Sequence, residues 1–300
     1  FDYFKGFNSL LVHWIGEPHR SAYRPDVQTE QGIRFIEEHA REPFFLSQSY
    51  YPPHEPMDPP KRFLEHYPGQ EHAAYYGTVS NLDWNVGRLV EALRRNGILD
   101  DTLIIVTSDH AKAWGPRPGS YPGGMCTAYD EASRIPLILR YPRLLPQGAV
   151  WRSGVSLVDL MPTILSVAGI KPVMGYIPRP DRPLLQGRDL LPEIQAGRDR
   201  WASPIVMQNI PLRAIDGTFY DERAVRLERH KLILRKYHAG AEFRPGELYD
   251  MQADPGETRN LYEVAAHRSA VASLAATLRT WGRQYRDDLA EQLGEWAEKH

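Results

Sequence analysis

An aspartate and a histidine stand next to each other at Asp109 and His110, directly after the apolar, β-branched run of residues 102–107. A carboxylate supplies a hard oxygen ligand and an imidazole supplies a nitrogen ligand, so one metal ion could use both. Because successive side chains of a strand point to opposite faces, the two can converge only if the strand ends before them. The alternative is that Asp109 caps the next turn while His110 is solvated, and the spacing alone does not decide between them.

A second histidine, His54, lies in the proline-rich segment YPPHEP at residues 51–56. The prolines prevent a regular strand and hold the histidine on an irregular loop. Its imidazole could deliver a proton to a leaving group, or it could be a buried hydrogen-bonding group, and both interpretations stay open. The segment YDE at 129–131, followed by Arg134, has the spacing of an ion pair on a helix surface, which predicts a structural role.

The hydrophobic pattern predicts the elements that must position these residues. A helix is predicted to follow Asp26 as its N-cap, and the run FFLSQSY at 44–50 is predicted to be a buried strand that leads into the His54 loop. Residues 102–107 and 135–140 read as further strands, and a helix opens at Asp159 and ends before Gly169. The clearest helix ends at Gly97 and has a stripe of apolar residues at helical spacing: Tyr75, Val79, Leu82, Val86, Leu89 and Leu93.

This alternation of strands and helices predicts an α/β fold with a mostly parallel sheet covered by helices on both faces. Ligands of such sheets bind at the carboxyl ends of the strands, which is where Asp109 and His110 stand. A Pro- and Arg-rich linker at 171–188 precedes a predicted antiparallel hairpin of residues 224–227 and 231–234. The chain is expected to end in a helix with one packing stripe: Val271, Leu274, Leu278, Trp281, Tyr285 and Leu289.

Composition limits the classes of protein that are possible. The 300 residues carry 36 Lys and Arg against 38 Asp and Glu, a formal charge of −2, so no basic field for nucleic acid is expected. No apolar run approaches the roughly 18 residues that cross a bilayer. The single cysteine, Cys126, cannot form an internal disulfide. The chain begins FDYFKGF, which leads us to expect a start inside a longer protein; compartment and oligomeric state are not predicted.

Taken together, the short motifs resemble those of the sulfatase family in order and spacing. The resemblance covers nearly the whole chain and rests on PPHEP at 52–56, YGTVSNLD at 76–83, TSDH at 107–110, YDE at 129–131, VDLMPTIL at 158–165, GRDLL at 187–191 and ELYD at 247–250.

The resemblance implies an alkaline-phosphatase-like three-layer α/β sandwich, incomplete at the N-terminus, with a small C-terminal antiparallel α+β subdomain. We expect residues 1–198 to form the C-terminal part of the catalytic core and residues 199–300 to form the subdomain. The implied activity is hydrolysis of sulfuric ester bonds in a small-molecule or glycan substrate, with Ca²⁺ or another divalent cation and a formylglycine nucleophile. By the same resemblance, Asp109 and His110 bind the metal, and His54 contacts the sulfate or protonates the leaving oxygen.

The sequence departs from the family pattern at several points. The Cys/Ser-x-Pro-x-Arg motif that yields formylglycine does not occur in these 300 residues, and we expect it upstream, together with two aspartates of the metal site. There is no lysine from 113 to 170, so the sulfate contact that the resemblance gives to a family lysine is either lost or supplied by another residue, such as Lys112 or Arg117. The chain alone is predicted to be inactive. Two alternatives stay open: a phosphodiester or phosphonate monoester hydrolase of the same superfamily, and a non-catalytic relative that binds sulfated glycans or a partner protein.

Overall fold

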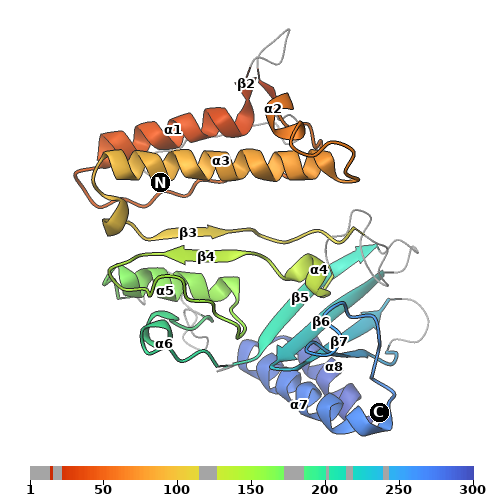
Figure 1. Ribbon diagram of the computed structural model, residues 1–300. Coiled ribbons are helices and arrows are strands. Elements are labelled where there is room, and N and C mark those ends of the chain that lie inside the picture. Colours follow the sequence, from red (N-terminus) through yellow and green to blue (C-terminus); the bar gives the residue numbers. More distant parts are fainter. Residues whose placement is uncertain are drawn as a thin grey trace. The chain divides into compact units, whose positions relative to one another are not determined.

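The computed structural model describes residues 14–15, 22–114, 127–171, 186–200, 203–213, 219–238 and 243–300 (Figure 1). They belong to two compact units, residues 1–103 and residues 104–300. Within the described ranges, no helix is both long and apolar enough to cross a bilayer.

Two helices form the body of the first unit, α1 (Arg24–His39) and α3 (Ala73–Arg95), which lie side by side (Figure 1). The short helix α2 (Lys61–Leu64) and the 3₁₀ turn η1 (Leu99–Asp101) flank α3, and the two-residue strands β1 (Trp14–Ile15) and β2 (Ala22–Tyr23) pair antiparallel. The predicted helix ending at Gly97 is confirmed, and Gly97 has a φ of 71°, which a residue without Cβ adopts readily.

The start of α1 differs from the prediction. The helix begins at Arg24, with Pro25 in its first turn, where the missing N–H is no loss. Asp26 is therefore inside the helix and is not its N-cap. Its Oδ1 accepts hydrogen bonds from Asn81 Nδ2 at 2.9 Å and Asn85 Nδ2 at 2.8 Å, so the buried contact of α3 with α1 includes a polar cluster.

The strand predicted at residues 44–50 is not formed. No described segment pairs with it, and the Phe45 side chain is 66% exposed. The segment is held instead by side chains of α1, because Gln28 Nε2 donates to the Ser49 carbonyl at 2.9 Å and the hydroxyls of Thr29 and Tyr50 are 2.7 Å apart. A strand needs a neighbouring backbone to complete its hydrogen bonds, which an apolar run cannot specify by itself.

The second unit opens with β3 (Ile104–Thr107), which pairs antiparallel with β4 (Leu137–Arg140). Both strands were predicted, but as members of a mostly parallel sheet. Every strand pair within the described ranges is antiparallel, so the parallel sheet is not found there. The remaining elements of this half are α4 (Asp130–Ser133), η2 (Leu157–Asp159), α5 (Leu160–Val167) and α6 (Leu191–Gln195). The α/β class is confirmed at this coarser level; the three-layer sandwich and the division at residue 198 stay predictions.

The helix predicted from Asp159 is confirmed as η2 followed by α5. The Ser156 N–H donates to Asp159 Oδ2 at 2.9 Å within a capping box, and Arg188 N donates to Asp159 Oδ1 at 2.9 Å. The chain passes so close at Gly187 that a Cβ there would lie 1.9 Å from the Val158 carbonyl oxygen, which explains the glycine. Most of the linker predicted at 171–188 lies outside the described residues.

A four-stranded antiparallel sheet in the order β5-β6-β7-β8 ends the fold, with helices α7 and α8 packed against it (Figure 1). Its bounds are β5 (Ile205–Arg213), β6 (Phe219–Leu227), β7 (His230–Tyr237) and β8 (Glu247–Asp250). The predicted hairpin is confirmed as β6 and β7. The core joins Val225, Leu232 and Leu248 of the sheet to Leu278 and Leu293 of the helices, all at most 1% exposed.

The predicted C-terminal helix is two helices, α7 (Arg268–Tyr285) and α8 (Asp288–Lys299), preceded by the 3₁₀ turn η3 (Ala265–His267). The chain reverses at Arg286, which has a left-handed φ of 56°, and Asp287 then caps α8 by accepting a hydrogen bond from Ala290 N at 2.9 Å. Leu289 therefore belongs to the second helix. The apolar stripe continues across the break, which is why the spacing concealed it.

Candidate active site

The His54 loop fixes the tautomer of its histidine. The backbone N–H of His54 donates to the Tyr51 carbonyl at 3.2 Å, and the imidazole ring packs on the ring of Tyr51 with centroids 4.6 Å apart. Nδ1 lies 2.9 Å from the Glu55 carbonyl oxygen, which can only accept, so Nδ1 carries a proton. Nε2 is therefore the atom that would gain and deliver a proton. The side chain is 37% exposed, which gives a substrate access to it.

The turn after β3 places the two predicted metal ligands together. Ser108 Oγ donates to Asp109 Oδ1 at 3.2 Å and to the His110 carbonyl at 2.8 Å, and His110 N donates to Asp109 Oδ1 at 2.9 Å. The ring of His110 is oriented by Nδ1, which donates to the Ala111 carbonyl at 2.8 Å. Asp109 Oδ2 and His110 Nε2 then lie 3.7 Å apart. The structure has features of both interpretations of this pair. Asp109 Oδ1 accepts hydrogen bonds within the turn, as a capping residue does, while Oδ2 lies beside His110 Nε2, as a second ligand atom would.

Electrostatics keep Asp109 ionised. Desolvation acts to raise the pKa of this carboxyl, but the hydrogen bond from the His110 N–H, the nearby imidazole and the Ser108 hydroxyl outweigh it and lower the pKa below its ordinary value. The Asp109 side chain is 85% exposed and that of His110 is 46% exposed. A charged oxygen and an imidazole nitrogen are thus both open to solvent at neutral pH.

The spacing of these two atoms fits one shared cation. Two ligand atoms that are each about 2.4 Å from a divalent cation lie roughly 3–4 Å apart, close to the separation of Asp109 Oδ2 and His110 Nε2. An imidazole nitrogen suits transition metals at least as well as Ca²⁺, so the pair does not select calcium. No group of three or more potential ligands is present among the residues that the structure describes. The pair can therefore supply only part of a complete coordination sphere.

The other predicted site residues are placed less completely. Lys112 follows the pair, and its Nζ lies 5.1 Å from the centroid of the Trp114 ring, a cation–π contact. Arg117 and Cys126 lie outside the described residues. His54 belongs to the 1–103 unit and the pair to the 104–300 unit, so the convergence of the three side chains stays a prediction.

The predicted surface ion pair of residues 129–134 is wrong in its partners. Asp130 binds Arg226 at 2.9 Å and Lys231 at 2.7 Å, both from the C-terminal sheet. Lys231 also lies 2.7 Å from Glu257, and its side chain is 0% exposed. Sequence reasoning missed this buried cluster. A signal was present in the sequence. Lys231 and the apolar Ile233 are two residues apart on β7, so their side chains lie on the same face of the strand.

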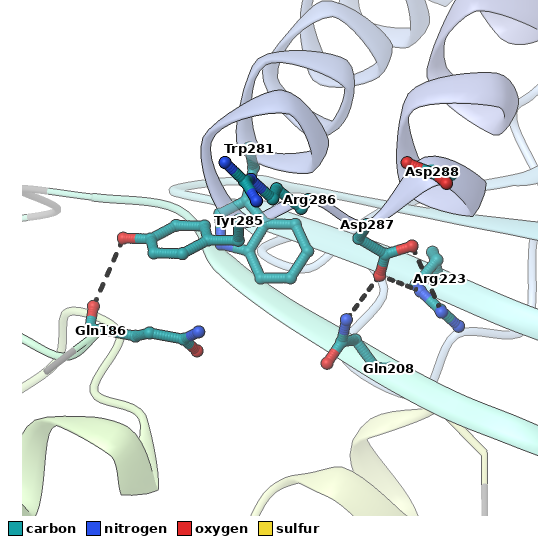
Figure 2. Close-up of a pocket in the computed structure, with 8 residues that line it drawn as sticks. All are labelled: Gln186, Gln208, Arg223, Trp281, Tyr285, Arg286, Asp287 and Asp288. Carbon is teal, nitrogen blue, oxygen red and sulfur yellow. Dashed lines mark hydrogen bonds and ion pairs between the residues drawn. The ribbon is translucent and has the colours of Figure 1, made fainter. Parts of the chain in front are cut away.

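A pocket of about 390 Å³ lies at the α7–α8 turn and contains none of the predicted site residues (Figure 2). Figure 2 shows Asp287 between Arg223 and Gln208. Asp287 Oδ2 accepts hydrogen bonds from Arg223 Nε at 2.6 Å and from Gln208 Nε2 at 2.5 Å. The Tyr285 hydroxyl lies 3.5 Å from the Gln186 carbonyl. Asp287 is thus satisfied by β5 and β6, and the contact attaches the turn to the sheet.

Fold and site together define a class: an α/β protein with a neighbouring carboxylate and imidazole at the end of a strand. Residues 1–170 match the family model described as Sulfatase, and residues 126–284 match the model described as N-sulphoglucosamine sulphohydrolase, C-terminal. The chain belongs to the sulfatase family.

Curated relatives agree with this family. The chain is 29% identical over 182 residues to the steryl-sulfatase of Homo sapiens, a match that covers 57% of the chain and 30% of that protein. It is 29% identical over 215 residues to the N-acetylglucosamine-6-O-sulfatase of Bacteroides thetaiotaomicron, covering 71% of the chain and 36% of the relative. The choline-sulfatase of Rhizobium meliloti is 30% identical over 190 residues, covering 63% and 33%. The chain therefore spans about a third of the length of these relatives.

Solved structures show the same fold. The structure of yidJ from Bacteroides fragilis has a TM-score of 0.71 at 25% identity and covers 90% of this chain and 61% of its own. BT4656, solved with its substrate D-glucosamine-2-N,6-O-disulfate, has a TM-score of 0.59 at 27% identity and covers 72% and 41%. The phosphonate monoester hydrolase SpPMH from Silicibacter pomeroyi, at 23% identity, has a TM-score of 0.56, covers 89% and 53%, and shares the fold alone.

Proposed function

We propose that this chain is the C-terminal portion of a metal-dependent sulfuric ester hydrolase whose nucleophile, a formylglycine, lies in a preceding segment. The observation that carries the proposal is the match of residues 1–170 to the sulfatase family. Within this matched segment, Asp109 Oδ2 and His110 Nε2 lie 3.7 Å apart. The substrate class is a glycan or small-molecule sulfate ester, since the relatives include a glucosamine sulfatase and a choline-sulfatase.

Each residue then has a role that follows from its chemistry. Asp109 Oδ2 and His110 Nε2 would hold a divalent cation, which would supply positive charge for the nonbridging sulfate oxygens. Lys112 supports the same oxygens with its ammonium group. His54, protonated on Nε2, would donate that proton to the ester oxygen that departs from sulfur. The S–O bond to that oxygen breaks as the nucleophile of the preceding segment bonds to sulfur, and a neutral alcohol leaves in place of an alkoxide.

The test measures the complete protein against 4-nitrophenyl sulfate, with Asp109→Asn and His110→Ala as variants and Asp83→Asn, on the exposed side of α3, as the control. We expect both site variants to lose at least about a hundredfold in kcat/KM and the control to keep it. A chelator should abolish the wild-type rate, and added Ca²⁺ or Mn²⁺ should restore it. Undiminished rates in both site variants would remove the pair from the active site.

A phosphonate monoester hydrolase is the second candidate, because a cation and a proton donor serve a phosphoryl group as well as a sulfuryl group. SpPMH shows that a phosphonate monoester hydrolase can have this fold. The same preparation is assayed with 4-nitrophenyl phenylphosphonate, and the larger kcat/KM identifies the native ester. Absence of turnover on both esters, with retained binding of a sulfated glycan, would instead support a non-catalytic binding protein, consistent with the lack of a lysine from 113 to 170.

A further inference from the structure

The turn that carries Asp109 and His110 is attached to the rest of its unit by the residues on either side of it. Ala111 N donates to the Ala132 carbonyl of α4 at 2.8 Å, and on the other side Thr107 Oγ1 donates to the Pro136 carbonyl at 2.9 Å. Helix α4 has only four residues and cannot be stable by itself. Whatever holds α4 in place therefore also sets the position of the turn.

Buried charges of the C-terminal sheet hold the first turn of α4. Asp130 Oδ1 accepts from Lys231 Nζ at 2.7 Å and Oδ2 accepts from Arg226 Nη1 at 2.9 Å. Glu257 completes the group from both sides, because its Oε2 accepts from the Asp130 N–H at 2.6 Å and its Oε1 lies 2.7 Å from Lys231 Nζ. We call Asp130, Arg226, Lys231 and Glu257 the α4 clamp. The side chains of Lys231 and Glu257 are 0% and 1% exposed.

A second buried group holds the residues just before α4. Glu222 Oε1 accepts from Ala128 N at 2.8 Å, and the Tyr129 hydroxyl donates to Glu247 Oε2 at 2.5 Å. Arg235 neutralises both carboxylates, with Nε 2.7 Å from Glu222 Oε2 and an ion pair to Glu247. Residues 128–130 are thus fixed by five charged side chains of the sheet and its loops, over sequence separations of about a hundred residues.

Stability alone does not account for so many buried charges. Removing ions from water costs about as much as their attraction returns, and apolar residues of similar size often stabilise as well or better. Ion pairs do supply direction, since each hydrogen bond fixes the angle and distance of the group it holds. A requirement that α4 be held in one fixed position therefore explains the α4 clamp better than a requirement for added stability does.

We propose that Lys231, Asp130 and Glu257 are positioning residues that act through α4 and Ala111 to set where Asp109 and His110 present their ligand atoms. The purpose of this placement, binding of a divalent cation, rests on the proposed function. The placement itself does not, and it can be measured without any metal.

The first measurement is hydrogen–deuterium exchange of the Ala111 amide in the complete protein. The variant Lys231→Met/Glu257→Gln removes one cation and one carboxylate and leaves Asp130 paired with Arg226. Its matched control is Arg223→Met/Asp287→Asn, which removes a buried ion pair of the same sheet that attaches the α7–α8 turn (Figure 2). We expect Ala111 to exchange about tenfold faster in the first variant and at the wild-type rate in the control.

Unchanged exchange at Ala111 in the clamp variant, or equal acceleration in both variants, would overturn the proposal. Should the double variant fail to fold, Glu257→Gln alone keeps an acceptor for the Asp130 N–H, and we expect it to accelerate Ala111 exchange by a smaller factor. An unchanged rate in a folded Glu257→Gln protein would count against the clamp in the same way.

The second measurement is calorimetric titration with calcium alone. We expect the clamp variant to raise the Kd for calcium about tenfold while the control stays within about twofold of wild type. A clamp variant with faster Ala111 exchange but an unchanged Kd would overturn the link to the ligand atoms. If the wild-type protein binds no calcium although Ala111 exchange responds to the clamp variant, the assignment of calcium in the proposed function fails and the positioning role stands.

Discussion

At the scale of single residues, the tautomer of His54 decides what it can do. Its Nδ1 is committed to the Glu55 carbonyl at 2.9 Å, so proton delivery falls to Nε2. A general acid matters most when the departing oxygen is a strong base, as in an alkyl sulfate, and least for a nitrophenolate.

We therefore predict that His54→Ala in the complete protein lowers kcat on an alkyl sulfate by about 10²–10⁴-fold and lowers kcat on 4-nitrophenyl sulfate much less. Steady-state rates on the two esters give the comparison, and His66→Ala, an exposed histidine of the same unit, is the control. Equal losses on both esters would assign His54 to sulfate binding and not to proton transfer.

Asp250, at the end of β8, gives a pH dependence of stability whose sign is fixed. The Arg229 guanidinium, with Nε 2.7 Å from Asp250 Oδ2, and the backbone N–H groups of Gln252 and Ala253 hold the pKa of this carboxyl well below its usual range. The folded chain thus binds this proton less readily than the unfolded chain does. The resulting stabilisation is complete above the unfolded pKa, about 4, and is lost progressively as the pH falls from there toward the lower folded pKa.

The variant Asp250→Asn should accordingly have a lower melting temperature than the wild type at pH 7, and the difference in melting temperature should narrow as the pH is lowered toward 3. Thermal unfolding followed by circular dichroism at several pH values measures this gap. A gap that stays constant from pH 7 to 3 would show that the Arg229 contact does not control the titration of Asp250.

At the scale of elements, periodicity predicted what local sequence determines. The helices α1, α3 and α5, the strands β3 and β4, and the hairpin β6–β7 were all found near their predicted positions. The failures have a common cause, which is dependence on a distant neighbour. Among the described residues no strand pairs with the run at 44–50, β3 and β4 are antiparallel, and the apolar stripe of the last helix hides its break at Arg286.

Close packing of α7 on α8 depends on two glycines. A Cβ at Gly294 would lie 2.6 Å from the Ala275 carbonyl oxygen and 2.8 Å from Arg279 Cβ, and Gly282 has similarly close neighbours in the loop and α8. The backbone of α7 cannot move away without separating the helices, because Leu278 of α7 and Leu293 of α8 are buried in the same core. The helix pair is therefore intolerant of added volume at this contact.

We predict that Gly294→Ala destabilises the fold by about 1–3 kcal/mol, despite the better helix propensity of alanine. The control is Gly87→Ala, within α3, where an added Cβ meets nothing within 4 Å. This change should stabilise by about 0.5–1 kcal/mol. Urea unfolding of both variants measures the difference, and a stabilised Gly294→Ala protein would show that the two helices are less tightly packed than described.

At the scale of the whole molecule, the candidate site was predictable in part. Asp109 and His110 are neighbours in sequence, so their proximity required only that the strand end before them. The α4 clamp was not predictable in this way, because it joins Asp130 to Lys231 and Glu257 across about a hundred residues and depends on the complete fold of the C-terminal sheet. Long-range ion pairs leave only a weak trace in one sequence.

The ligand count of the chain leads to the last prediction. Calcium takes about six to eight ligands, and the site described in these residues offers Asp109 and His110. If the nucleophile and the remaining ligands lie in a preceding segment, residues 1–300 expressed alone should bind calcium with a Kd in the millimolar range or weaker, and the complete protein should bind it far more tightly. The isolated chain should also give no turnover of 4-nitrophenyl sulfate above the rate of its Asp109→Asn variant. Calorimetry and the sulfate assay, run on both proteins, compare them directly. Turnover by the isolated chain that depends on Asp109 would mean that these residues already contain the nucleophile, and formylglycine would have to be abandoned as its identity.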